Sequence, residues 1–297
     1  NEFVLSHKVS SHACFVQMYC MIKLNNNSFV LVMEYFPHEQ LYDALCDYHY
    51  RFELIDKYVI IYQLIKSIEY MASLKIMHRD LKLENILLDI DTLKLKIVDF
   101  GFSTNEGTSQ MACGSTHYAC PLVLSDTNYN KRVDVWSLGI IIYIILTIKM
   151  FWNSIIKNEI QNEINILRYM QIKTLTNDIK KLIAGMSIDV SLKNMLKSML
   201  NPRNRTNYPT STMRIESICN RTQPWIQFLE RNIIDGFRRG KNMGYINVLQ
   251  DNTLNITETP TPALASEPEP APLVEPNTQT TRAVSSTQFN MNNLNHV

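Results

Sequence analysis

The chain has 297 residues, of which 45% are hydrophobic and 19% are charged, and its formal net charge at pH 7 is +1. This near balance of charge gives no electrostatic case for a nucleic-acid partner or for a membrane surface, and we expect neither. The cysteines are scattered without a CxxC pair or a metal-ligand spacing, so reduced thiols in a cytoplasmic or nuclear setting are the expected state.

Strand signals dominate the first hundred residues. Residues 28–34 (SFVLVME) are apolar, rich in β-branched side chains and preceded by three asparagines, which predicts a hairpin strand. Residues 56–74 place apolar side chains near helical spacing, which predicts a long amphipathic helix. Residues 86–89 and 95–99 are short apolar runs on either side of a turn, and they predict a second hairpin.

Helical patterns dominate from Asp134 onward. The longest apolar run, residues 135–148, is too short to span a membrane and predicts a buried core helix. A few strands followed by a larger helical part predict an α+β architecture. We predict four helices in this part of the chain, over residues 136–147, 155–169, 192–200 and 225–233.

The composition changes towards the C-terminus. Six of the eleven prolines fall between Pro260 and Pro276, among Thr, Ala, Glu and Ser, so residues 252–297 are predicted to be a disordered tail. Residues 236–251 carry glycines and basic side chains and are predicted to be a linker. Residues 1–235 are then the predicted folded domain.

One loop carries the catalytic chemistry. The sequence HRDLKLEN places Asp80 and Lys82 one residue apart, so in an extended loop both side chains face the same way. A carboxylate there can accept a hydroxyl proton while the ammonium neutralises charge on a transferring phosphoryl group. Asn85, and the Asp99 of a DFG that follows, offer the hard oxygen ligands that Mg²⁺ prefers when it also binds phosphates.

These motifs carry a family resemblance. In order and spacing, HRDLKLEN, DFG and the later Asp134-Val135-Trp136-Ser137-x-Gly139 resemble the eukaryotic protein kinase family. Lys82 within the first motif favours the Ser/Thr protein kinases. The stretch CGSTHYACP, which contains Ser115, resembles the substrate-positioning loop of the calcium/calmodulin-related branch, to which AMP-activated-kinase-like enzymes belong. The resemblance implies a protein-kinase-like fold with a mostly helical C-lobe and a remnant of the small β-rich N-lobe.

The resemblance implies an ATP site. Met33 matches the gatekeeper, and the backbone of Glu34 and Phe36 would form hydrogen bonds to the edge of the adenine. Leu87 matches the residue that packs beneath the adenine ring, although Met33 and Leu87 also suit an ordinary core. Glu2 falls where the family has the glutamate of its N-lobe helix, which pairs with a lysine of the third strand.

The resemblance also assigns roles at the site of transfer. Asp80 would be the catalytic base, Lys82 would stabilise the transferring group, and Asn85 and Asp99 would hold Mg²⁺. Ser115 would steer the hydroxyl of a protein substrate. The expected cofactors are therefore ATP and Mg²⁺, and the expected partners are protein substrates.

Four further residues are expected to support the site without doing chemistry. His78 would stack under Phe100, and Asp134 would accept backbone hydrogen bonds from the turn that contains Arg79. In the family, that arginine orders the activation segment through a phosphorylated threonine, and Met111 stands at the position of this threonine. We therefore expect Arg79 to lack that partner. Either Ser109, Thr108 or Thr116 substitutes for the threonine or the loop needs no phosphorylation, and our hypothesis is control that is independent of phosphorylation.

Other departures concern the N-lobe and the substrate side. No glycine precedes Gly101, so the sequence contains neither the family's glycine-rich loop nor the strand that carries its lysine. From this, and from the absence of an initial Met, we expect a truncated chain that by itself binds ATP poorly and is weak or inactive. Leu122 replaces the glutamate that pairs with the arginine matched here by Arg205.

Two functions remain open on the sequence alone. The first is a Ser/Thr protein kinase that transfers the γ-phosphoryl group of ATP to protein hydroxyls. The alternative is a pseudokinase, a binding scaffold without turnover, which Met111 and Leu122 favour. The intact Asp80, Lys82 and Asp99 favour the enzyme, because a scaffold has no chemical need for them.

Overall fold

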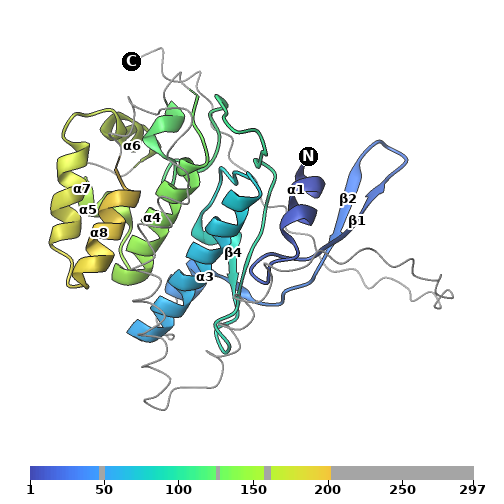
Figure 1. The fold of residues 1–297 in the computed structure, drawn as a ribbon, viewed down its shortest axis with the longest axis horizontal. Helices are drawn as coiled ribbons and strands as arrows, with labels where there is room; N and C mark the ends of the chain where they lie inside the picture. The colour runs from blue at the N-terminus through green and yellow to red at the C-terminus, as the bar shows by residue number, and fades with distance from the viewer. Residues whose placement is uncertain (47–50, 125–127, 157–161, 202–297) are drawn as a thin grey trace.

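The computed structural model describes residues 1–46, 51–124, 128–156 and 162–201. A helical body lies beside a smaller part that holds helix α1 (Glu2–Val9) and the hairpin of β1 (Met18–Lys23) and β2 (Phe29–Met33) (Figure 1). This arrangement confirms the predicted α+β architecture, in which the larger part is helical and the β-rich part is small.

The β1–β2 hairpin confirms the strand predicted over residues 28–34. The two strands are antiparallel, with Met18 opposite Met33. Asn27 supplies a left-handed residue in the turn, with φ of 61°. Helix α1 contacts strand β1. Most side chains of both strands are nevertheless exposed, and the exposed apolar ones include Tyr19, Met21, Ile22, Phe29 and Val30.

A second small sheet contains the strand that directly follows the loop of residues 78–85. Strands β3 (Glu39–Gln40), β4 (Ile86–Leu88) and β5 (Leu95–Ile97) are antiparallel in the order β3-β4-β5. The pairing of β4 with β5 confirms the hairpin predicted for residues 86–99. Two short helices flank this sheet in the sequence, α2 (Leu41–Cys46) and the 3₁₀ helix η1 (Leu83–Asn85).

Two long helices form the centre of the helical body. Helix α3 (Leu54–Ser73) and helix α4 (Arg132–Thr147) confirm the helices predicted over residues 56–74 and 136–147. All residues of α4 from Val133 to Ile145 are buried, as predicted for a core helix. Among the described residues, no helix has both the length and the apolarity to cross a membrane.

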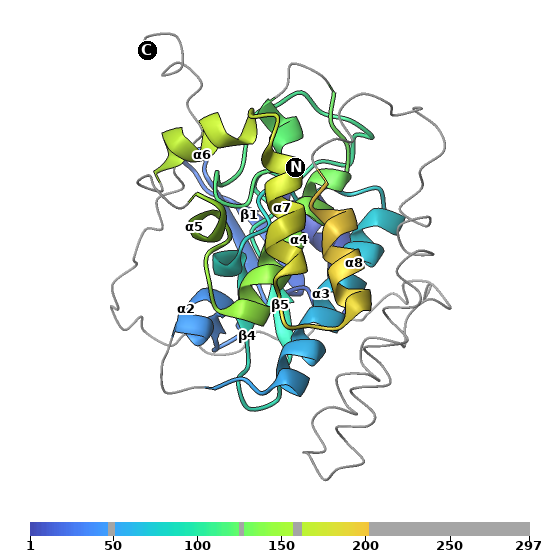
Figure 2. The same ribbon diagram turned by 90° about the vertical axis from the view of Figure 1, so that its left-hand side faces the viewer.

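Helix α8 (Val190–Met199) packs closely on α4, and it confirms the helix predicted over residues 192–200. Figure 2 shows α7 (Leu175–Ala184) and α8 in front of α4, on the outer side of the body. The close approach depends on Gly139, because a Cβ there would lie 2.9 Å from two carbons of the buried Leu200 side chain.

The single helix predicted over residues 155–169 is wrong. Helix α5 (Phe151–Ile155) ends where that helix was expected to begin, and Ile156 is extended. Helix α6 (Glu163–Met170) begins only after Asn162, whose side chain accepts the amide of Asn165. The predicted helix over residues 225–233, the linker at 236–251 and the tail at 252–297 lie outside the described residues, as does the boundary at 235.

Candidate active site

The loop of residues 78–85, which carries the predicted catalytic residues, is held by Asp134 in the first turn of α4. The amides of His78 and Arg79 donate to the two carboxylate oxygens of Asp134, at 2.8 and 2.9 Å. These are the backbone bonds that the resemblance implied. Burial raises the pKa of Asp134, and the two amides oppose that effect by stabilising the charged form. The bonds also hold Arg79 in a left-handed conformation, with φ of 70°.

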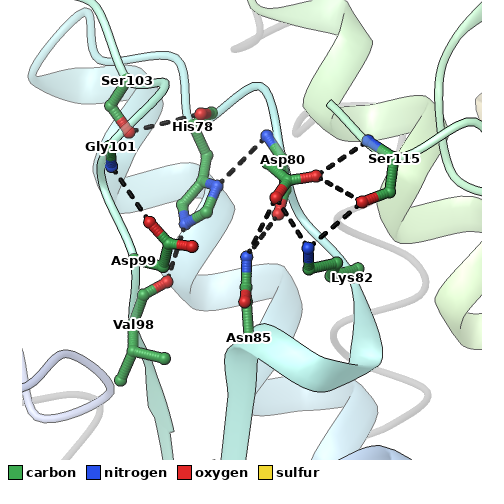
Figure 3. Close-up of polar contacts among 9 residues, drawn as sticks. All are labelled: His78, Asp80, Lys82, Asn85, Val98, Asp99, Gly101, Ser103 and Ser115. Carbon is green, nitrogen blue, oxygen red and sulfur yellow. Dashed lines mark hydrogen bonds and ion pairs between the residues drawn. The ribbon is translucent and has the colours of Figure 1, made fainter. Parts of the chain in front are cut away.

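Three polar side chains converge at the end of this loop (Figure 3). One oxygen of Asp80 accepts both the amide and the hydroxyl of Ser115, each at 2.9 Å. The other oxygen of Asp80 lies 2.9 Å from the Lys82 ammonium, which also donates to the Ser115 hydroxyl at 3.2 Å. Asp80 is only 5% exposed, so its carboxylate is fixed by these partners. The sequence predicted that Asp80, Lys82 and Ser115 act at one site, and the structure brings them together.

His78 connects the catalytic loop to the segment that carries Asp99. Its Nδ1 accepts the Asp80 amide at 3.4 Å, so Nε2 carries the proton and donates to the Val98 carbonyl at 3.1 Å. The imidazole also lies against the Phe100 ring, with centroids 4.8 Å apart. The carboxylates of Asp80 and Asp99 therefore belong to neighbouring segments, with His78 between them (Figure 3).

The donor chemistry near Asp99 fits a magnesium ion. The Asn85 amide nitrogen donates to the Asp80 carbonyl at 2.9 Å, which leaves the Asn85 side-chain oxygen available. One Asp99 oxygen accepts the Gly101 amide at 3.2 Å, and Asp99 is itself left-handed and exposed, with φ of 67°. Two protein oxygens suit Mg²⁺, because it fills its other positions with water and phosphate oxygens. No cluster of three or more metal-binding side chains occurs in the described part of the chain.

Glu2 lies beside this acidic end of the site. Its carboxylate would be 3.9 Å from a Cβ built on Gly101. Burial, followed by the charge of Asp99, raises the pKa of Glu2. A cation bound at Asp99 would relieve this repulsion.

The segment after β2 contains Glu34 and Phe36, whose backbone groups were predicted to bind the adenine edge. The Glu34 amide donates to the Gln17 carbonyl at 2.8 Å, and the Phe36 carbonyl accepts the His38 amide at 2.9 Å. No hydrogen bond within the described ranges engages the Glu34 carbonyl or the Phe36 amide. Met33 ends β2 and is 41% exposed. Leu87 lies half-buried in β4, opposite Gln40.

The activation segment gives Arg79 partners other than a phosphate. Its guanidinium donates to the hydroxyl of Ser109, one of the substitutes considered for the missing threonine, at 2.8 Å and to the Phe102 carbonyl at 2.5 Å. Ser109 in turn exchanges two backbone hydrogen bonds with Tyr129, each 2.9 Å long. Met111, where the family has its activating threonine, is 53% exposed.

Sequence reasoning missed the structural importance of Gly114. This glycine has φ of +95°, and a Cβ on it would lie 2.4 Å from the Arg79 carbonyl. Only glycine allows the segment to approach the catalytic loop so closely and present Ser115 to Asp80. Its place directly before Ser115 was the available signal. Leu122, which replaces the glutamate that pairs with an arginine in the family, is buried in the 3₁₀ helix η2 (Pro121–Leu124). Arg205, which matches that arginine, lies outside the described residues.

Comparison with known proteins shows which family the chain resembles. The family model described as "Protein kinase domain" matches residues 1–220. A probable serine/threonine-protein kinase KIN1 homolog of Enterocytozoon bieneusi is 34% identical over 57% of this chain and 30% of its own length. Calcium-dependent protein kinase 4 of Plasmodium falciparum is 31% identical over 75% of this chain and 40% of its own length.

A third relative comes from a plant. The SNF1-related protein kinase catalytic subunit alpha KIN12 of Arabidopsis thaliana is 37% identical over 46% of this chain and 27% of its own length. The matched regions thus span less than half the length of these relatives.

Proposed function

The chain belongs to the protein kinase family, and from that premise we propose that it transfers the γ-phosphoryl group of ATP to serine and threonine hydroxyls of proteins. The family model and the relatives confirm the resemblance seen in the motifs, including that to the calcium/calmodulin-related, AMP-activated-kinase-like branch. The family model also confirms the kinase-like fold class. Members of this family use ATP with Mg²⁺.

The single observation that carries the proposal is the contact of Asp80 with both Lys82 and Ser115 at 2.9 Å. Asp80 orients the attacking hydroxyl and takes its proton as the new bond to phosphorus forms. Lys82 remains beside the base and stabilises negative charge on the transferring group. Ser115 fixes Asp80 from the substrate side, because it accepts from Lys82 and donates to the carboxylate.

The nucleotide is held by two separate parts of the chain. The Glu34 carbonyl and the Phe36 amide bind the adenine edge, and Leu87 packs beneath the ring. Asn85 and Asp99 would hold the metal ion, which when bound would neutralise negative charge on the phosphates. A scaffold without turnover is not favoured, because adenine binding alone would not require the ion pair between Asp80 and Lys82.

The test is phosphoryl transfer from labelled Mg·ATP to a library of serine and threonine peptides, with the complete product of the gene. We expect Asp80→Asn and Asp99→Asn each to lower kcat at least about 100-fold, because the base and the metal ligand act as a unit. Asp91→Asn is the matched control, since this exposed acid lies in the turn between β4 and β5. Turnover by Asp80→Asn within about tenfold of the unsubstituted protein would contradict the proposal.

A further inference from the structure

One ammonium group links the two ends of the proposed nucleotide site. Lys96 lies in β5, and its Nζ is 3.0 Å from a Glu34 carboxylate oxygen and 3.1 Å from the Phe15 carbonyl. The Lys96 side chain is 16% exposed and that of Glu34 is 28% exposed, so water only partly screens the pair. We propose that Lys96 is a positioning residue that fixes the adenine-binding backbone relative to Asp99. The inference rests on the proposed function, because it places ATP on Glu34 and Asp99.

On the adenine side, Lys96 acts through Glu34. The carboxylate oxygen that accepts from Lys96 also accepts the Gln17 amide at 3.0 Å, and the Glu34 amide donates to the Gln17 carbonyl at 2.8 Å. Burial raises the pKa of Glu34, but the Gln17 amide and Lys96 outweigh it and lower the pKa overall. The carboxylate therefore stays charged, and these bonds fix the residue whose carbonyl faces the adenine.

On the metal side, Lys96 acts through its own strand. The amide of Ile97, the next residue, donates to the Cys14 carbonyl at 2.7 Å, and Phe15 packs edge-on against Phe100 at 5.9 Å. Two residues beyond Ile97 the chain reaches Asp99. The segment 14–17 is thus hydrogen-bonded both to β5 and to Glu34. The Lys96 ammonium connects all three, because it lies on β5 and donates to both the Phe15 carbonyl and the Glu34 carboxylate.

Without the ammonium, the two ends lose a shared fixed point. In Lys96→Met, the Glu34 carboxylate keeps only the Gln17 amide among the partners found in the described residues, and the Phe15 carbonyl loses the Lys96 donor. The Glu34 carbonyl can then move relative to Asp99, so that adenine and metal contacts are no longer satisfied together. Asp80 and Lys82 are untouched, so the transfer step of bound nucleotide stays intact.

The experiment measures nucleotide affinity and turnover in the complete gene product. For Lys96→Met we expect the Kd of a fluorescent Mg·ATP analogue and the KM for ATP to rise about tenfold, the effect of one charge-assisted hydrogen bond. We expect kcat to stay within about twofold, because the groups that act in transfer are unchanged. Lys96→Arg keeps the charge and the donors and should restore the affinity. Lys94→Met, the same change at an exposed position two residues earlier, is the matched control.

A second measurement needs no nucleotide. Amide hydrogen exchange in the nucleotide-free protein should quicken in Lys96→Met at residues 34–36 and 97–101 together, and not in Lys94→Met.

The inference would be overturned by a Lys96→Met protein that loses stability but keeps its nucleotide Kd, or by one in which kcat falls and KM does not. An unsubstituted protein that binds no nucleotide would overturn it as well. Nucleotide binding that depends on Lys96, without any phosphoryl transfer, would support it and sink the proposed kinase activity instead.

Discussion

Two residues of the site are held in backbone conformations that ordinary side chains disfavour. Arg79 and Asp99 have φ of 70° and 67°. Such conformations cost about 1–3 kcal/mol each and persist only where the surroundings fix them. Asp134 fixes the first through the Arg79 amide, and the Gly101 amide bonded to the Asp99 carboxylate supports the second. The strain therefore lies beside Asp80, the proposed base, and at Asp99, the proposed metal ligand, and it fixes the backbone that carries these two carboxylates.

The contact of Arg79 with Ser109 predicts how the activation segment is ordered. Since the guanidinium already donates to the Ser109 hydroxyl at 2.8 Å, we expect the segment to be held without a phosphate. We expect Ser109→Ala to lower kcat roughly three- to tenfold, the loss of one hydrogen bond to a charged group, and phosphatase treatment to leave kcat unchanged. Thr108→Ala, at the exposed neighbouring position, should have no effect. A phosphorylated residue between Asp99 and Pro121 that proved necessary for turnover would contradict this prediction.

Among the helices, α4 is the one around which the helical body packs. It contacts both α3 and α8, and its residues from Val133 to Ile145 are buried. Because this part of the helix is buried on all sides, its apolar run needs no polar face. The helix ends at Ile148, whose amide donates to the Ile144 carbonyl at 2.7 Å. Ile148 is left-handed, with φ of 53°, at a position that usually holds glycine.

This helix end carries a stability prediction. A Cβ in the left-handed region destabilises the folded state by about 1–2 kcal/mol, and glycine removes this cost. Glycine also makes the unfolded chain more flexible, which lowers the gain in stability by about 0.5–1 kcal/mol. We expect Ile148→Gly to raise the free energy of unfolding by about 0.5–1 kcal/mol, measured by urea denaturation. Lys149→Gly, the next residue and also exposed, should lower it, because only the entropic term applies there. A decrease for Ile148→Gly would mean that the apolar contacts of Ile148 outweigh its strain.

At the scale of the whole molecule, a short segment ties the small β part to the helical body. The Ser11 hydroxyl lies 2.6 Å from the Tyr70 hydroxyl in α3, and the His12 ring stacks on the Tyr70 ring at 4.8 Å. Nδ1 of His12 accepts the Cys14 amide at 3.2 Å. These contacts set the position of α1 and the hairpin relative to the catalytic loop.

This junction makes stability depend on pH. Burial, then the charges of Lys66 and Lys96, lowers the pKa of His12 from 6.5 to about 4. Below pH 6.5 the unfolded chain takes up a proton that folded His12 refuses, so the free energy of unfolding falls as the pH falls towards 4. Because the ring is only half-buried, we expect about 1 kcal/mol between pH 7 and pH 5.

The test compares urea unfolding of the unsubstituted protein and His12→Phe at both pH values. Phenylalanine keeps the stacking on Tyr70 and removes the titration, so the variant should lose less stability at low pH. All other titrating groups are shared and cancel in the difference. An equal loss in both proteins would contradict the assignment to His12.

The amino-acid sequence was enough to predict that the candidate catalytic residues lie close together. Asp80, Lys82 and Asn85 lie within six residues, so their spacing alone fixes that they share one loop. Long periodic or apolar segments such as α3 and α4 were also readable, because burial of one face or of the whole helix leaves its pattern in the chain. The helix expected over residues 155–169 failed because its apolar pattern did not reveal the break after Ile155.

The tertiary structure alone decided how these residues are held. Arg79 meets Ser109, Lys96 meets Glu34, and Asp134 meets the loop amides across 30, 62 and 55–56 residues of chain. No local pattern records such pairs, because they form only when packing brings distant segments to within hydrogen-bond range. Spacing along the chain therefore places the candidate reactive groups in one loop, whereas packing sets the orientation of their side chains and their hydrogen-bond partners.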